Sequence, residues 1–203
     1  MKRHPVTINL SALLFSLVIT LFSFSHSIAG NLTARSSQII DPRLRQLLTR
    51  AINQPSSFND HFAAEVWLLD MSTRLKPFIK DKKQRLSLLK QIHYEASRVH
   101  LAPELVLAVI EVESHFDAYA ISRSGAQGLM QVMPFWLRET GHPEDNLINI
   151  KTNLRLGCTI LKYYMGLENN DLHKALARYN GSSGSRVYSE KVLQALRQHW
   201  YRA

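Results

Sequence analysis

Apolar side chains recur at helical spacing along most of the chain, and no alternating strand of useful length is present. Two such faces consist of Phe62, Val66, Leu69 and Leu75 in residues 59–75, and of Leu86, Leu89, Ile92, Ala96 and Val99 in residues 84–100. Residues 103–114 are apolar nearly all round, which is typical of a helix buried in the middle of a domain. Further helices are expected over 128–140, where Pro134 interrupts the helix, and over 152–165, 171–179 and 188–200. The pattern predicts an all-α fold.

Proline and charge divide this helical pattern into segments. Asp41-Pro42 has the residues preferred at the N-cap and first position of a helix, which we expect to run to about Ala51. Lys76-Pro77 and the charged residues 80–83 mark the next boundary. We therefore expect a leader and helical extension over residues 30–80, and a core domain over residues 81–203.

The N-terminus has the pattern of an export signal. Lys2 and Arg3 precede an apolar stretch over residues 6–24, and Ser27-Ile28-Ala29 has the small-x-small pattern of a cleavage site. We expect a signal peptide over residues 1–29 and a periplasmic location. An uncleaved anchor that associates with the membrane is the alternative, because the apolar stretch is long for a signal peptide.

Composition and charge narrow the class of protein. The 203 residues are 45% hydrophobic and 20% charged, which is a globular composition long enough for one ordinary domain. Removal of Lys2 and Arg3 lowers the formal net charge from +9 to +7, so the chain favours anionic surfaces. Nucleic acid is not the expected partner, since no aromatic residues are interleaved with the basic ones. The single cysteine, Cys158, lies on an apolar helical stripe and is expected in the core.

Glu113 is the first candidate for chemistry. It lies at the end of the apolar helix, beside Val109 and Ile110 at helical spacing. Partial burial and the negative end of the helix dipole both raise the pKa of a carboxyl, as a general acid at neutral pH requires. Glu111 lies about 200° round the helix and cannot share a proton with it. On position alone, an ordinary surface glutamate at a helix end remains the alternative.

The residues after Glu113 complete a longer pattern. Glu113-Ser114 is followed fifteen residues later by Gly128-Leu129-Met130-Gln131, and Tyr179-Asn180 comes later still. In this order and spacing, the three elements resemble the signature of the soluble lytic transglycosylase family, over about residues 84–200. The resemblance implies a lysozyme-like helical domain whose cleft has the glycine-containing block as one wall. Arg178 departs from the pattern, since many members have Ala before Tyr-Asn.

The resemblance also implies a role for each matching residue. Glu113 would be catalytic. The substrate-binding residues would be Ser114, Gly128, Met130, Gln131, Tyr179 and Asn180. Gln131 has an amide suited to sugar hydroxyl and acetamido groups, and Tyr179 could donate a hydrogen bond towards Glu113. Met130 could instead pack in the core, and Ser114 and Asn180 could cap their helix ends.

The implied reaction uses one carboxyl, whereas most glycosidases use two. The nearest second carboxyl is Asp117, which is expected to cap the loop. Glu113 would protonate the oxygen between N-acetylmuramic acid and N-acetylglucosamine in peptidoglycan glycan strands, then take the proton of the muramic carbon-6 hydroxyl, giving a 1,6-anhydromuropeptide. No metal or cofactor is required, and no His-Glu-x-x-His spacing is present. A lysozyme-like hydrolase and a non-catalytic wall-binding protein are the alternatives.

Overall fold

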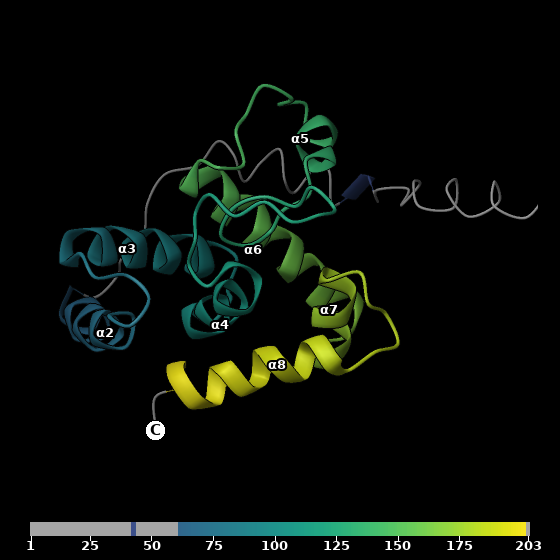
Figure 1. Ribbon diagram of the computed structural model, residues 1–203. Helices are drawn as coiled ribbons and strands as arrows, with labels where there is room; N and C mark the ends of the chain where they lie inside the picture. The colour runs from purple at the N-terminus through teal and green to yellow at the C-terminus, as the bar shows by residue number, and fades with distance from the viewer. Residues whose placement is uncertain (1–41, 44–60, 202–203) are drawn as a thin grey trace, which may run out of the picture. The chain divides into compact units, whose positions relative to one another are not determined.

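The computed structural model describes residues 42–43 and 61–201, and Figure 1 shows how their helices are arranged. The elements are α2 (His61–Arg74), α3 (Lys82–Arg98), α4 (Pro103–Ser114), α5 (Phe135–Glu139), α6 (Ile150–Leu167), α7 (Leu172–Tyr179), α8 (Val187–Ala195) and the π-helix η1 (Leu196–Trp200). These described residues contain isolated β-bridges but no strand, which confirms the all-α prediction for this part of the chain. None of their helices is both long and apolar enough to cross a bilayer. The predicted signal peptide and most of the helix expected from Asp41 lie outside the described residues.

Local signals in the sequence set the starts of several helices. Asp81, Asn149 and Asp171 are N-caps, and each side chain accepts a hydrogen bond from the backbone N–H three residues later. Pro103 begins α4, and His115 ends it in the left-handed region with φ 50°. The bounds predicted for α4 are therefore confirmed.

Helix α4 forms the centre of the fold. All of residues 105–110 are buried, as the nearly continuous apolar sequence predicts. Figure 1 shows α4 between α3 and α8, and both of these helices and η1 pack against it. The last turn of α4 is therefore held from several sides, which fixes the position of Glu113.

The apolar face predicted for residues 59–75 is wrong at Val66 and Leu69 and correct at Leu75. Val66 and Leu69 are 39% and 70% exposed, whereas Trp67, Met71 and Leu75 are buried. Trp67 is the largest of these side chains, and burying it together with Met71 on a different face of α2 removes apolar surface from water. These three residues belong to the same hydrophobic cluster as α4. The expected boundary near residue 81 is thus a turn between two helices that share one core.

A buried carboxylate joins α3 to α6. Glu95 is 1% exposed and accepts hydrogen bonds from Arg98 Nε (2.8 Å) and Arg155 Nε (3.0 Å). Arg98 also donates to the Thr159 hydroxyl oxygen at 2.7 Å. Because a buried charge is tolerated only when it is paired, this cluster fixes the register of the two helices.

Candidate active site

Glu113 lies in the last turn of α4 and is partly buried. Its Oε1 accepts a hydrogen bond from the Tyr188 hydroxyl at 2.6 Å. Burial raises the pKa of the Glu113 carboxyl to about 7, although the bond from Tyr188 acts in the opposite direction. The carboxyl is therefore poised between its neutral and ionised forms at neutral pH, which suits a group that both gives and takes a proton.

A depression of about 340 Å³ opens at Glu113. Its lining residues are Val112, Glu113, Asn180, Ser182, Ser185, Val187, Tyr188 and Lys191. Glu113 is the one carboxylate in this set of described residues. The amide and hydroxyl groups that share the depression with it are suited to binding a sugar.

The bond predicted from Tyr179 to Glu113 is wrong, because Tyr188 makes it instead. The Tyr179 hydroxyl donates to the Met130 carbonyl oxygen at 2.7 Å. Burial and the nearby Glu113 raise the pKa of both tyrosines well above the ordinary value, so each stays protonated as a donor. No local sequence pattern predicts this role for Tyr188, because it lies in the first turn of α8, 75 residues from Glu113.

Position 128 requires a glycine, because the backbone there packs closely against α6. Its φ is +73°, and a Cβ atom there would lie 2.5 Å from Asn153 Nδ2 and 2.6 Å from the Leu147 carbonyl oxygen. Asn153 accepts from Met130 N (2.8 Å) and donates to the Gln127 carbonyl oxygen (2.7 Å). Asn153 therefore holds in place the segment of residues 128–131, which we call the predicted wall, a role that sequence reasoning missed. None of residues 128–131, all of which the structure describes, is among the residues that line the depression at Glu113.

The side chain of Met130 lies in the core. It is 0% exposed, and its Sδ is 3.9 Å from Cys158 Sγ. A Cβ atom on Gly157 would lie 2.5 Å from the Sδ atom of Met130. The expectation that Cys158 is a core residue is confirmed, and burial raises the pKa of its thiol. Met130 thus supports the wall from behind and does not face the depression.

Comparison with known proteins gives the family. Residues 90–195 match the family described as Transglycosylase SLT domain. The chain belongs to this family. It is similar to membrane-bound lytic murein transglycosylase C of Pectobacterium atrosepticum, with 32% identity over 142 residues, or 61% of this chain and 39% of that protein.

The protein of the same name from Yersinia pestis (strain Pestoides F) is 30% identical over 131 residues, or 57% of this chain and 36% of that protein. The chain spans well under half the length of these curated relatives.

In this SLT domain, Gln131 and Ser114 hold the wall together. Gln131 has φ 48°, and its Nε2 donates to the carbonyl oxygens of Ala120 (3.1 Å) and Gly128 (2.9 Å). The Ser114 hydroxyl donates to the Leu129 carbonyl oxygen at 2.8 Å. The end of α4 is therefore tied directly to the Gly-Leu-Met-Gln segment.

Asn180 is both the C-cap of α7 and part of the lining of the depression. Gly181 follows it with φ +73°, as a helix C-terminus favours. Arg178, two residues before Asn180, is absent from that lining set and donates to Glu168 Oε1 at 2.7 Å. Arg178, which replaces the Ala found in many SLT domains, therefore does not displace Asn180 from the lining of the depression.

The two other carboxyls near Glu113 have separate partners. Asp117 Oδ1 accepts from the Tyr119 backbone N–H at 2.8 Å, so it shapes the loop as expected. Glu111 accepts from Trp200 Nε1 at 2.7 Å and lies 2.8 Å from His199 Nδ1. Neither residue lines the depression at Glu113.

Proposed function

We propose that this protein is a lytic transglycosylase that cleaves the β-1,4 bond between N-acetylmuramic acid and N-acetylglucosamine in peptidoglycan. The observation that carries the proposal is a single carboxyl, Glu113, with a pKa of about 7 in a depression lined by amide and hydroxyl groups. The names of its relatives, lytic murein transglycosylases, support the same substrate class.

The proposed reaction has two proton transfers through one residue. Neutral Glu113 donates its proton to the bridging oxygen as the bond from that oxygen to the muramic carbon 1 breaks. The acetamido carbonyl oxygen of the same sugar assists the positive charge that develops there. The Glu113 carboxylate then takes the proton of the carbon-6 hydroxyl, and the oxygen of that hydroxyl forms a bond to carbon 1 of the same sugar. Glu113 returns to its neutral form, and no water is consumed.

Tyr188 assists both steps as a positioning residue. Its hydroxyl donates to the carboxylate that exists between the two proton transfers. Burial stabilises the neutral acid needed for the first step, whereas this hydrogen bond stabilises the base needed for the second.

The predicted binding residues divide into two groups in this proposal. Asn180 contacts the substrate directly, as part of the lining of the depression. The other predicted residues hold the wall that faces the glycan, through the contacts described above: Ser114, Gly128, Met130, Gln131 and Tyr179.

We also propose that residues 1–29 export the protein to the periplasm, where peptidoglycan lies. The relatives are named as membrane-bound, which supports a location in the cell envelope. The catalytic domain would comprise residues 81–203, with α2 of the preceding extension packed on its core.

Substitution Glu113→Gln tests the proposal. Gln keeps the shape of the side chain but cannot donate the proton, so we expect clearing of purified cell wall to slow by a factor of about 10²–10⁴. Asp117→Asn, a matched change at a carboxyl outside the depression, is expected to keep the wild-type rate. A Glu113→Gln protein with the wild-type rate would show that Glu113 is not the acid.

A further inference from the structure

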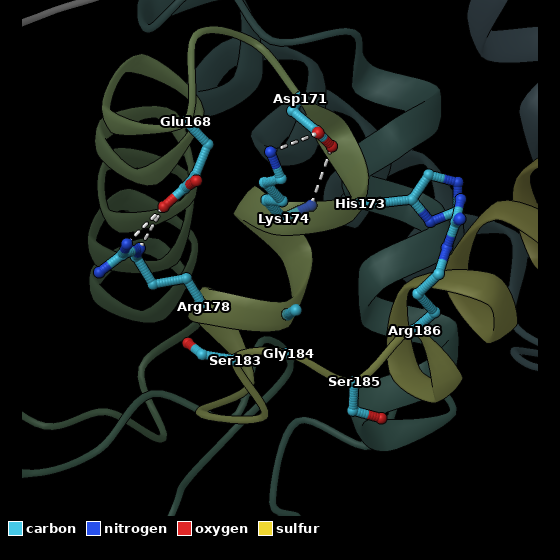
Figure 2. A pocket seen from close by; sticks show the side chains of 10 residues that line it. Glu168, Asp171, His173, Lys174, Arg178, Ser183, Gly184, Ser185 and Arg186 are labelled. Atoms are coloured by element: carbon cyan, nitrogen blue, oxygen red, sulfur yellow. Dashed lines mark hydrogen bonds and ion pairs between the residues drawn. The ribbon is translucent and has the colours of Figure 1, made fainter.

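A second and larger depression, of about 450 Å³, lies on the side of α7 shown in Figure 2. Charged side chains from the end of α6, from α7 and from the loop before α8 surround it. Its lining includes Glu168, Asp171, Lys174, Arg178, Ser185 and Arg186, and we call it the charged pocket.

The charged pocket adjoins the depression at Glu113. Ser185 lines both. Ser182 lines the depression at Glu113, whereas Ser183 and Gly184 line the charged pocket. A single short loop is therefore the partition between the two, and a ligand that leaves the first beside this loop meets the second.

Positive charge exceeds negative charge in the charged pocket. Arg178 and Lys174 are paired with Glu168 (2.7 Å) and Asp171 (3.4 Å) at separate places on the rim in Figure 2. The third cation, Arg186, faces Glu190, which is outside the lining set, across 3.8 Å.

The ion pairs of two of these cations are weak. The side chains of Lys174 and Arg186 are 69% and 67% exposed. Exposed pairs contribute little to stability, so these two cations can bind a ligand carboxylate at small cost.

We propose that the charged pocket binds the peptide stem of the muramic sugar through its carboxylates, an inference that rests on the proposed function. The N-acetylated sugars of the glycan carry no charge, and the lactyl carboxyl of the muramic sugar is used in the amide bond to the peptide. The charges of the substrate therefore lie on the peptide. Lys174 and Arg186 bind its carboxylates, and Glu168 and Asp171 can accept from its free amine.

The position of the stem fits this assignment. The peptide is attached to the sugar whose carbon 1 reacts, so it leaves the cleft close to Glu113. An extended peptide advances roughly 3.5 Å per residue, so a few residues suffice to cross one loop. The hydroxyls of Ser183 and Ser185 lie along this path and can bind the peptide backbone.

The test compares soluble glycan strands that carry peptide stems with strands from which an amidase has removed them. The amidase leaves a lactyl carboxylate on each muramic sugar, so both kinds of strand carry negative charge, but only the stem is long enough to cross the loop to the charged pocket. In the double variant Lys174→Ala/Arg186→Ala, we expect KM for the peptide-bearing strands to rise roughly three- to tenfold, with kcat unchanged and both constants unchanged on bare strands. The double variant Lys83→Ala/Lys90→Ala loses the same charge from exposed positions of α3 and is expected to match wild type on both substrates.

A direct binding measurement separates this inference from the proposed function. Isotope-labelled wild-type protein, titrated with the isolated tetrapeptide stem, should show chemical-shift changes at Ser183 and Ser185, which line the charged pocket and are kept in the double variant, and the double variant should lack these changes. An unchanged KM, an equal rise on both kinds of strand, or an absence of these shifts would overturn the inference. Binding of wild type and the double variant to phosphatidylglycerol vesicles is measured as well. If the double variant loses vesicle binding while its KM for peptide-bearing strands is unchanged, the charged pocket binds a lipid phosphate and the inference is overturned. Failure to form anhydro product from either strand would instead contradict the proposed function.

Discussion

Two opposing influences act on the carboxyl of Glu113. Burial favours the neutral acid, and the hydrogen bond from Tyr188 favours the ionised base. With the pKa at about 7, neither form is strongly disfavoured at neutral pH. A single residue can therefore serve in both halves of a reaction that consumes no water.

Tyr188→Phe removes the influence that favours ionisation. The pKa of Glu113 is then expected to rise above its value of about 7. The acid step requires the protonated carboxyl, so activity is lost as pH rises through this pKa. We expect the alkaline limb of the pH–rate profile to move to higher pH, with a maximal rate about tenfold lower because the carboxyl is less well held.

Tyr179→Phe is the matched control for this profile. Its hydroxyl bonds to the Met130 carbonyl oxygen, so its loss should lower the free energy of unfolding by about 1 kcal/mol and leave the alkaline limb in place. The reverse result, a shifted limb in Tyr179→Phe and none in Tyr188→Phe, would contradict the assignment of these two tyrosines.

The residue-scale account was only partly predictable from sequence. Glu113 could be nominated because its helix position and apolar neighbours are local features. Its donor could not, since Tyr179 and Tyr188 both come from distant segments, and only the packing of α8 against α4 selects Tyr188.

At the scale of elements, the predicted wall at residues 128–131 depends on α6. Asn153 is 1% exposed and bonds to the backbone at Gln127, Met130 and Leu147. The wall itself has no regular secondary structure, so these bonds take the place of a helix or strand.

Asn153→Ala is expected to lower the free energy of unfolding by about 2–4 kcal/mol, because it leaves buried backbone groups without partners. Urea denaturation measures this. Asn149→Ala, a change of the same size at the N-cap of the same helix, should cost only about 1 kcal/mol. Equal costs for the two changes would show that Asn153 does not support the wall.

The helices were predicted correctly where local sequence signals determine their bounds, and incorrectly where hydrogen bonds to distant residues determine the backbone conformation. Pro103 and a continuous apolar run defined α4 correctly. Of the helix expected over 128–140 with an interruption at Pro134, only the part after the proline, Phe135–Glu139, forms. Gly128 and Gln131 have positive φ, which is outside the range of a right-handed helix. Gly128 packs closely against Asn153, and Gln131 donates to the carbonyl oxygen of Ala120, so contacts outside the segment decide its conformation.

At the scale of the whole molecule, α2 belongs to the single core that positions α4. Trp67 Nε1 donates to Glu104 Oε1 at 2.7 Å, and Met71 is fully buried. The all-α fold followed from sequence periodicity, but the buried face of α2 did not. Both of its faces carry apolar residues, and the contact with α3 decides between them.

Met71→Ala should therefore destabilise the entire domain by about 2–5 kcal/mol, in one cooperative transition. Leu69→Ala removes a similar side chain from the exposed face of α2 and should change the free energy of unfolding by about 0.5 kcal/mol or less. A separate early transition in Met71→Ala, with the main transition unmoved, would show that α2 folds apart from the core.

The product of cleavage tests the central claim most directly. Purified peptidoglycan would be digested by the wild-type protein in water enriched in heavy oxygen, and the fragments analysed by mass spectrometry. A reaction in which Glu113 acts as acid and then base, with the carbon-6 hydroxyl as the nucleophile, predicts 1,6-anhydromuropeptides that contain no oxygen from the solvent. Reducing-end muropeptides that carry the heavy label, without anhydro product, would contradict it and show that the protein is a hydrolase.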